Sequence, residues 1–405
     1  MGQSGAGTLL NGFAGLFLIA NHNLSYFETE PIPSTDLIRS RVGVAFDSRT
    51  VIILKRFLAS NVAHAFMDDH VTLFFAYEGV CAGDVDKYIG WIAPLYVDEG
   101  MTRTDDRYES FYRVFADGDP VIHLKSSRPN REERVVCFEE AIVGMKKRVK
   151  YYDVGSALGE FERPLESTLR PADLNRFNDF FLRRLAMRSP TGSTHYDLQR
   201  QECRSNATYS PIVLLERFYT RRILNARDVA FVLSKALIEA FPEYAGHPRP
   251  VHLMSEELND LLEIVCAVKN ARVLAGMHGA LLQTVMFLPE NSGLVELFPF
   301  GLNPDQYTPY KTIATRLREK VEYAAWRNAN RTNSFENPLI RHDGRLDEVD
   351  GVERDRIERM TEVPRLPCCG AKEFRYWLNQ DTRVDEANLL GVARGVMARM
   401  RARTV

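Results

Sequence analysis

The chain has 405 residues, of which 45% are hydrophobic and 26% charged, as is typical of a folded globular protein rather than a disordered one. This length allows two domains of ordinary size, each with its own core. The 52 basic and 54 acidic residues leave a formal net charge of −2, so no strong field favours nucleic acid or an anionic membrane as a partner.

The only candidate targeting segment is an apolar run over residues 8–20. It is too short to span a bilayer and it lacks a basic flank, because Arg39 is the first basic residue of the chain. A buried pair of strands is the favoured interpretation, and a signal or anchor is the alternative.

The 6 cysteines are too few for a disulfide scaffold and show no metal-ligand spacing. Acceptor sequons for N-glycosylation begin at Asn23, Asn206 and Asn330, which is compatible with a lumenal protein.

In the first half, residues 51–55 predict a strand that leads into a helix near Asn61. Further strands are expected at 135–138 and 141–143, and a helix rich in Phe and Leu at 174–187. The polar, Pro-bearing segment 189–210 is the best candidate for a linker.

Asn61, His64 and Asp68 share one face of the helix predicted near Asn61, because they are spaced by three and four residues. A carboxylate beside an imidazole is the arrangement that a general base, or its support, requires. Asp69 is turned about 100° away from Asp68 on an α-helix. A solvent-facing polar stripe is the alternative interpretation.

From residue 210 onward, short apolar runs alternate with segments of helical period. Strands are predicted at 212–215, 251–254, 272–276 and 294–298, with helices that begin after Asn225, Ser255 and His278. This alternation predicts a parallel, doubly wound sheet. A basic amphipathic helix is expected at 389–401, packed on the body of the protein.

His278, Gly279 and Ala280 follow one predicted strand and precede a helix. Ligands of open α/β sheets bind at the carboxyl ends of strands, where Gly279 would permit close approach and His278 could donate to a phosphate. Glu296 interrupts an apolar strand, and a buried carboxylate is costly unless it is paired. Ribose hydroxyls, an arginine or backbone amides could supply the partners.

A series of short segments, in order along the chain, resembles glycosyltransferase family 61. These segments are 272–280, 287–289, 294–299, 303–311, 323–328, 362–365, 368–369 and 380–385. The resemblance implies a GT-B-like α/β fold with two Rossmann-like domains that face a cleft. The expected domains are 1–205 on the acceptor side, 206–366 for the UDP-sugar, and a helical tail at 367–405.

The resemblance also implies an inverting transfer of N-acetylglucosamine from UDP-GlcNAc to protein O-linked mannose, in a β-1,4 linkage. Arg217 and Arg221 match arginines that face the diphosphate in the family, and His278, Gly279, Ala280 and Glu296 complete the expected donor site. The catalytic base is expected among Asp68, His64 and Asp69, with Asn61 on the acceptor side.

No obligatory metal or other cofactor is expected, since arginines and helix amides can take the charge of the leaving diphosphate. The Asp-x-Asp triplets that begin at Asp84 and Asp117 are the alternative, because such triplets hold manganese in other transferases.

The expected partners are the UDP-sugar and an O-mannosylated protein, such as a dystroglycan-like glycoprotein, in the lumen of the endoplasmic reticulum. A membrane is expected only through an anchor that is missing or cryptic in this sequence. Two alternatives stay open. One is transfer to Ser or Thr of EGF-type domains, and the other is a catalytically impaired binding relative, favoured by Glu216 and Phe218 where the family pattern has Ser and Thr.

Overall fold

The computed structural model describes the backbone of residues 16–20, 23–27, 43–55, 61–81, 83, 85, 92–98, 109–115, 122–125, 134–143, 170–187, 209–255, 257–317, 321–337, 346, 349–364 and 371–403. The chain divides into two compact units. One comprises Met1–Val149 and Asp179–Pro190, and the other Lys150–Asn178 and Thr191–Val405. The domain boundaries expected from the sequence stay a prediction.

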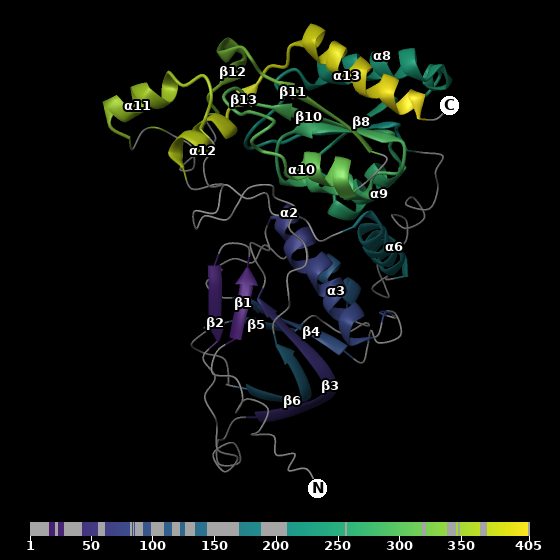
Figure 1. The fold of residues 1–405 in the computed structure, drawn as a ribbon, viewed down its shortest axis with the longest axis vertical. Coiled ribbons are helices and arrows are strands. Elements are labelled where there is room, and N and C mark those ends of the chain that lie inside the picture. Colours follow the sequence, from purple (N-terminus) through teal and green to yellow (C-terminus); the bar gives the residue numbers. More distant parts are fainter. Residues whose placement is uncertain are drawn as a thin grey trace. The chain divides into compact units, whose positions relative to one another are not determined.

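The first unit contains a sheet of four parallel strands in the order β5-β4-β3-β6 (Figure 1). Their bounds are β3 (Gly43–Lys55), β4 (Ile92–Asp98), β5 (Ile122–Lys125) and β6 (Arg134–Val143). The two strands expected at 135–138 and 141–143 are one strand, because Glu140 continues the ladder opposite Thr50. A separate antiparallel pair consists of β1 (Leu16–Ala20), at the end of the apolar run 8–20, and β2 (Asn23–Phe27), which lies beyond that run. The burial of this pair stays a prediction.

One continuous helical segment follows β3 and carries the polar stripe. It begins as α2 (Val62–His64), widens through a π-helical turn, η1 (Ala65–His70), and ends as α3 (Val71–Val80). Buried aromatic side chains hold it in place, since Phe66 packs edge-on against both Phe111 and Phe181. The remaining elements here are α5 (Glu109–Tyr112) and η3 (Arg113–Phe115), and α6 (Pro171–Met187), whose residues are divided between the two units.

The second unit is a doubly wound α/β sheet of five parallel strands, in the order β11-β10-β9-β7-β8. The strands are β7 (Ile212–Leu215), β8 (Val251–Met254), β9 (Val273–Met277), β10 (Ser292–Phe298) and β11 (Val321–Arg327). The predicted parallel sheet is confirmed. β7, β9 and β10 are buried along their whole length, which is why their sequences are mostly apolar, with Glu296 of β10 as the charged exception.

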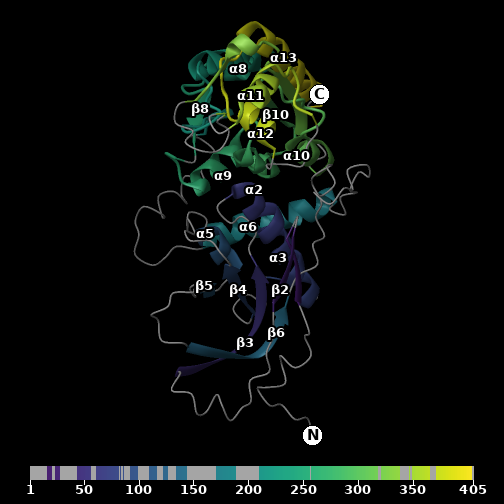
Figure 2. The same cartoon turned by 90° about the vertical axis from the view of Figure 1, so that its left-hand side faces the viewer.

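Helices cover both faces of this sheet. Helices α8 (Ala226–Ala240) and α13 (Glu386–Ala402) lie on one face, whereas α9 (Leu261–Asn270) and α10 (Pro309–Thr312) lie on the other (Figures 1 and 2). The smaller elements are η5 (Pro242–Tyr244), η6 (Ala280–Phe287), η7 (Ile313–Leu317), η8 (Arg331–Asn333), β12 (Ser334–Phe335), α11 (Gly351–Glu358), α12 (Lys372–Leu378) and β13 (Asp381–Thr382).

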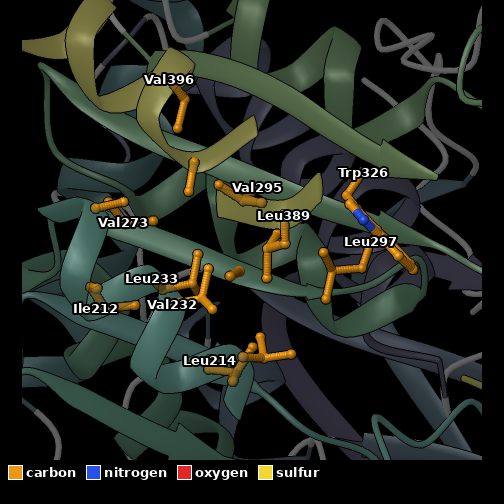
Figure 3. Close-up of a cluster of buried hydrophobic side chains, with 14 of the residues drawn as sticks. Ile212, Leu214, Val232, Leu233, Val273, Val295, Leu297, Trp326, Leu389 and Val396 are labelled. Atoms are coloured by element: carbon orange, nitrogen blue, oxygen red, sulfur yellow. The ribbon is translucent and has the colours of Figure 1, made fainter. Parts of the chain in front are cut away.

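The core between the sheet and the first pair of helices is continuous. Side chains of alternate strand positions, such as Leu214, Val273 and Val295, meet Leu233 of α8 and Leu389 of α13 (Figure 3). The helix near the carboxyl terminus therefore completes this core, which confirms that it packs on the body of the protein. None of the helices in the described ranges is both long and apolar enough to cross a membrane.

Two helix starts differ from the sequence prediction. Helix α9 begins at Leu261, because Asp260 and Glu263 form a capping box there. Ser255 instead closes a short turn, and Leu258, three residues after it, is 75% exposed. Asn225 does precede α8, but its side chain makes no capping bond and binds Val384 instead.

Candidate functional site

The strand order of the second unit defines the edge of the sheet at which a ligand is expected to bind. From the first strand, β7, the chain crosses outward to β8 and then returns to the opposite side of β7 to form β9. The connections from β7 and β9 thus leave in opposite directions, and ligands of such sheets bind at the carboxyl ends of the strands beside this switch point. Arg217 and Arg221 follow β7, and His278 and Gly279 follow β9. The fold therefore places these predicted residues at one position.

The two arginines converge on Gly279. A Cβ atom added to Gly279 would lie 2.6 Å from Nη1 of Arg217 and 3.0 Å from Nη1 of Arg221. The backbone of Gly279 is extended, with φ of 165°, so its conformation does not demand glycine. Glycine is favoured instead because the two guanidinium groups occupy the space that a Cβ atom would need. Two cations thus lie side by side next to the first residue of η6, Ala280, where backbone N–H groups lack partners within the helix.

The two arginines are held differently. Arg221 has the left-handed φ of 58°, and its Nη1 donates to the carbonyl oxygen of His278 at 2.9 Å. In the described part of the chain no group bonds to the guanidinium of Arg217, whose Nε is buried without an acceptor. Arg217 therefore has donors to offer to an anion.

A distant segment fixes the loop that carries these arginines. Asp381 is 1% exposed and accepts from the backbone N–H of Arg222 at 2.9 Å and from its guanidinium at 2.8 and 2.6 Å. Asn337 donates to the same carboxylate and to the carbonyl of Tyr219, both at 2.9 Å. The side chain of Asn225 exchanges two hydrogen bonds with the backbone of Val384. The sequence analysis missed this support, although 380–385 was among the segments that carried the family resemblance.

His278 belongs to a chain of three polar groups. Its Nδ1 lies 2.6 Å from Oε1 of Glu296, and the hydroxyl of Tyr323 donates to Oε2 of the same carboxylate at 2.9 Å. Glu296 is 0% exposed, and among the described residues His278 and Tyr323 are the hydrogen-bond partners of its carboxylate. The prediction that this carboxylate is buried and paired is confirmed. Its expected contact with ribose hydroxyls stays a prediction.

Aromatic rings enclose the imidazole of His278. Phe298 stacks on it at 4.9 Å between centroids, and Tyr310 lies at 5.4 Å. The side chain is nevertheless 10% exposed. Since Nε2 has no bonding partner and is not among the buried unpaired atoms of the described residues, Nε2 is the ring nitrogen that reaches solvent.

Glu216 stands next to Arg217, and its carboxylate forms no ion pair with either arginine in the described structure. Burial raises the pKa of Glu216 above its usual value. A raised pKa favours the neutral carboxyl group, which reduces its repulsion of a nearby anion.

A cluster of hydrogen bonds around Glu362, here called the clamp, joins further segments that carry the resemblance. Glu362 accepts from Asn303 at 3.1 Å, from Gln306 at 3.2 Å and from Arg327 at 2.8 Å. The bonds from Asn303 and Arg327 lower the pKa of Glu362, which favours the charged carboxylate. The clamp anchors the loop between β10 and α10, which brings Tyr310 to His278.

The polar stripe of the first unit pairs as the spacing predicts. Nδ1 of His64 lies 2.6 Å from Oδ2 of Asp68, whereas Asp69 accepts from the hydroxyl of Tyr112 at 2.6 Å. The expected pairing of His64 with Asp68 is confirmed. Asn61 caps the helix, since its Oδ1 accepts from the N–H of Ala63 at 3.0 Å. The π-helical turn that holds both aspartates was not predicted, and such turns are frequent at functional sites.

The other predicted sites are only partly covered. Asn330 is exposed and caps η8, and Asn23 lies in β2, but Asn206 and the triplets at Asp84 and Asp117 lie outside the described residues. No group of three or more His, Cys, Asp or Glu suited to a metal occurs in the described ranges. Cys266 is disulfide-bonded and Cys81 is buried.

The chain is similar to curated enzymes of one kind. It is 29% identical over 389 residues to the mouse protein O-linked-mannose β-1,4-N-acetylglucosaminyltransferase 2, a match that covers 94% of this chain and 60% of the relative. The human enzyme of the same name is 28% identical with the same coverage, and the Xenopus tropicalis enzyme is 27% identical over 92% of this chain and 59% of its own. The chain resembles the O-mannose N-acetylglucosaminyltransferases.

The chain spans about 60% of the length of these O-mannose N-acetylglucosaminyltransferases. No protein-family model matches it. A solved structure of a glycosyl transferase family 9 protein from Veillonella parvula aligns with 89% of this chain at 11% identity and a TM-score of 0.34, a similarity too low to support a conclusion.

Proposed function

We propose that this protein is a glycosyltransferase that transfers N-acetylglucosamine from UDP-GlcNAc to protein O-linked mannose in a β-1,4 linkage, with inversion. The names of its relatives support the transferase class and the O-mannose acceptor. The proposed architecture is GT-B-like, with the donor bound by the second unit.

The observation that carries this proposal is the pair of guanidinium groups over Gly279. Two cations side by side repel each other unless an anion lies between or beside them. A planar guanidinium suits the paired oxygens of a phosphate, and the donors of Arg217 have no protein partner in the part of the chain that the structure describes. A diphosphate at the carboxyl ends of β7 and β9 would use them.

The chemistry then needs one displacement. The hydroxyl oxygen of the acceptor sugar attacks C1 of N-acetylglucosamine, and the bond from C1 to the diphosphate oxygen breaks with its electron pair remaining on that oxygen. Arg217, Arg221 and His278 meet the charge of the leaving group. The proton of the acceptor hydroxyl passes to the pair of Asp68 and His64, which is the proposed base.

The acceptor and the compartment follow from the same resemblance. An O-mannosylated glycoprotein, such as a dystroglycan-like protein, is the proposed acceptor, and the lumen of the endoplasmic reticulum is the proposed site of action. The disulfide at Cys266 supports an oxidising compartment.

Calorimetry with UDP tests the donor site. Replacing Arg217 by Ala removes a charge-assisted hydrogen bond, so UDP binding should weaken by about 1–3 kcal/mol, which is roughly ten- to a hundredfold in Kd. Arg227→Ala is the matched control, because Arg227 is an exposed arginine on α8. Equal UDP affinity in the wild type and Arg217→Ala would refute the assignment. Transfer from UDP-GlcNAc, UDP-glucose and UDP-xylose to an O-mannosyl peptide or to an EGF domain then decides the donor and the acceptor.

A catalytically impaired binding protein is a second candidate, and Glu216 is the observation that favours it. A carboxylate beside a diphosphate opposes the bound donor unless it is protonated. Under this alternative the wild type would bind UDP but transfer no sugar, and Glu216→Ser would create or strongly increase transfer.

A further inference from the structure

We infer that Glu296 is a positioning residue that couples the binding of the diphosphate to the protonation of His278. This inference rests on the proposed function, since it concerns how the same site holds its anion. The acid–base state of His278 would then decide how tightly the donor and the released UDP are held.

The first step is the state of the ring. Glu296 is buried and receives the hydroxyl of Tyr323 on Oε2, so its Oε1 is left as the acceptor for Nδ1 of His278 at 2.6 Å. Burial, followed by the charge of Glu296, raises the pKa of Tyr323 well above its usual range, so this hydroxyl remains a donor. The carboxylate therefore fixes the proton of a neutral His278 on Nδ1.

The second step follows from that tautomer. With its proton on Nδ1, a neutral His278 presents a lone pair at Nε2, the nitrogen that reaches solvent. A lone pair repels a phosphate oxygen, and Nε2 can donate to phosphate only when the ring is protonated. The histidine must therefore take up a proton to contribute to anion binding, and the buried Glu296 is placed to stabilise the imidazolium that results.

The third step is the balance of charges around the ring. Glu296 from β10 favours protonation. Arg221, which bonds to the carbonyl of His278, and Arg217, beside Gly279, oppose it. Among the residues that the structure describes, the rings of Tyr307 and Tyr310 also face the imidazole. A diphosphate neutralises the two arginines and adds negative charge, so it removes the opposition while Glu296 remains. Anion binding should therefore favour the protonated form of the His278 ring.

Calorimetry in buffers of different ionisation enthalpy measures this coupling directly, because it counts the protons taken up with each UDP. Because the coupling has the ring of His278 take up a proton as UDP binds, the wild type should show net proton uptake at about pH 7.5, and its UDP affinity should fall as pH rises. His278→Asn, which can keep a bond to Glu296, should lose the uptake and serves to subtract the titration of the terminal phosphate of UDP. Glu296→Gln, which keeps the shape of the side chain, should lose the uptake as well.

Three outcomes separate the two proposals. Proton uptake that persists in Glu296→Gln overturns the role of Glu296, and uptake equal in the wild type and His278→Asn overturns the coupling, while UDP binding that depends on Arg217 leaves the proposed donor site intact. Absent UDP binding by the wild type would overturn the donor site and this inference together. If Glu296→Gln does not fold, an NMR titration of histidine-labelled wild type decides the question, because an unchanged His278 pKa on addition of UDP contradicts the coupling.

Discussion

Replacing Gly279 by Ala tests the arginine pair without removing either arginine. The added Cβ would lie 2.6 Å from Nη1 of Arg217, whereas non-bonded heavy atoms pack at about 3.5–4.0 Å. The tip of Arg217 must therefore retreat by roughly 1 Å, which breaks or distorts a charge-assisted hydrogen bond to phosphate worth about 1.5–3 kcal/mol. UDP affinity should fall by roughly ten- to a hundredfold in calorimetry.

The fold should tolerate this change. The backbone of Gly279 is extended, and the clashing atoms are the ends of flexible side chains, so the free energy of unfolding should stay within about 1 kcal/mol of the wild type in urea denaturation. Gly293→Ala is the control, since its Cβ would meet Met400 and Val396 at the amino end of β10, and its UDP affinity should be unchanged. Wild-type UDP affinity in Gly279→Ala would refute the reasoning, because no diphosphate could then depend on the position of Arg217.

Three further predictions concern charge and catalysis. Because burial raises the pKa of Glu216 above 4.5, the native state disfavours its carboxylate, and this loss of stability is absent in acid and grows as pH rises through 4.5 to the native pKa. Glu216→Gln should therefore raise Tm at neutral pH but not in strong acid, and an equal effect at both would contradict the assignment. Asp68→Asn should reduce sugar transfer by on the order of 100-fold while UDP affinity stays near wild type, and retained transfer in Asp68→Asn with loss in Asp69→Asn would make Asp69 the base. Chelation with EDTA should leave turnover largely intact, and turnover that is abolished and then restored by manganese would redirect attention to Asp84 and Asp86.

Much of the sheet could be predicted because its central strands are buried on both faces. Segments such as 212–215 and 294–298 read as short apolar runs, and the helices between them show a clear period. Strand β11 escaped prediction since its middle is only partly buried and mixes Glu322 and Tyr323 with small residues. The start of α9 was misplaced because Ser255 and Asp260 are both good capping residues, and only the capping box with Glu263 distinguishes them.

The same physics explains which site residues were found. His278 was found by a general rule, since ligands of open α/β sheets bind at the carboxyl ends of the strands, whereas Arg217 and Arg221 came from the family resemblance. The cost of burying a charge showed that Glu296 must be paired, but no period in the sequence indicates that Tyr323 and His278 are its partners. Asp381 was beyond prediction for a similar reason, because it acts on a loop 159 residues earlier through tertiary contacts alone.

The contacts of Asp381 and Val384 with the loop that carries Arg221 also set an order of events during synthesis. Asp381 and Val384 lie 159 residues after Arg222 and Asn225, so at about 5–20 residues per second they are made roughly ten to thirty seconds later. Strands β7, β8, β9 and β10 precede this segment along the chain, whereas the ties of Arg222 and Asn225 form only when residues 381–384 emerge. A nascent chain with these four strands would thus still lack part of the support of the loop that carries Arg221. Nucleotide binding would therefore appear only after the carboxyl-terminal segment has packed on the second unit.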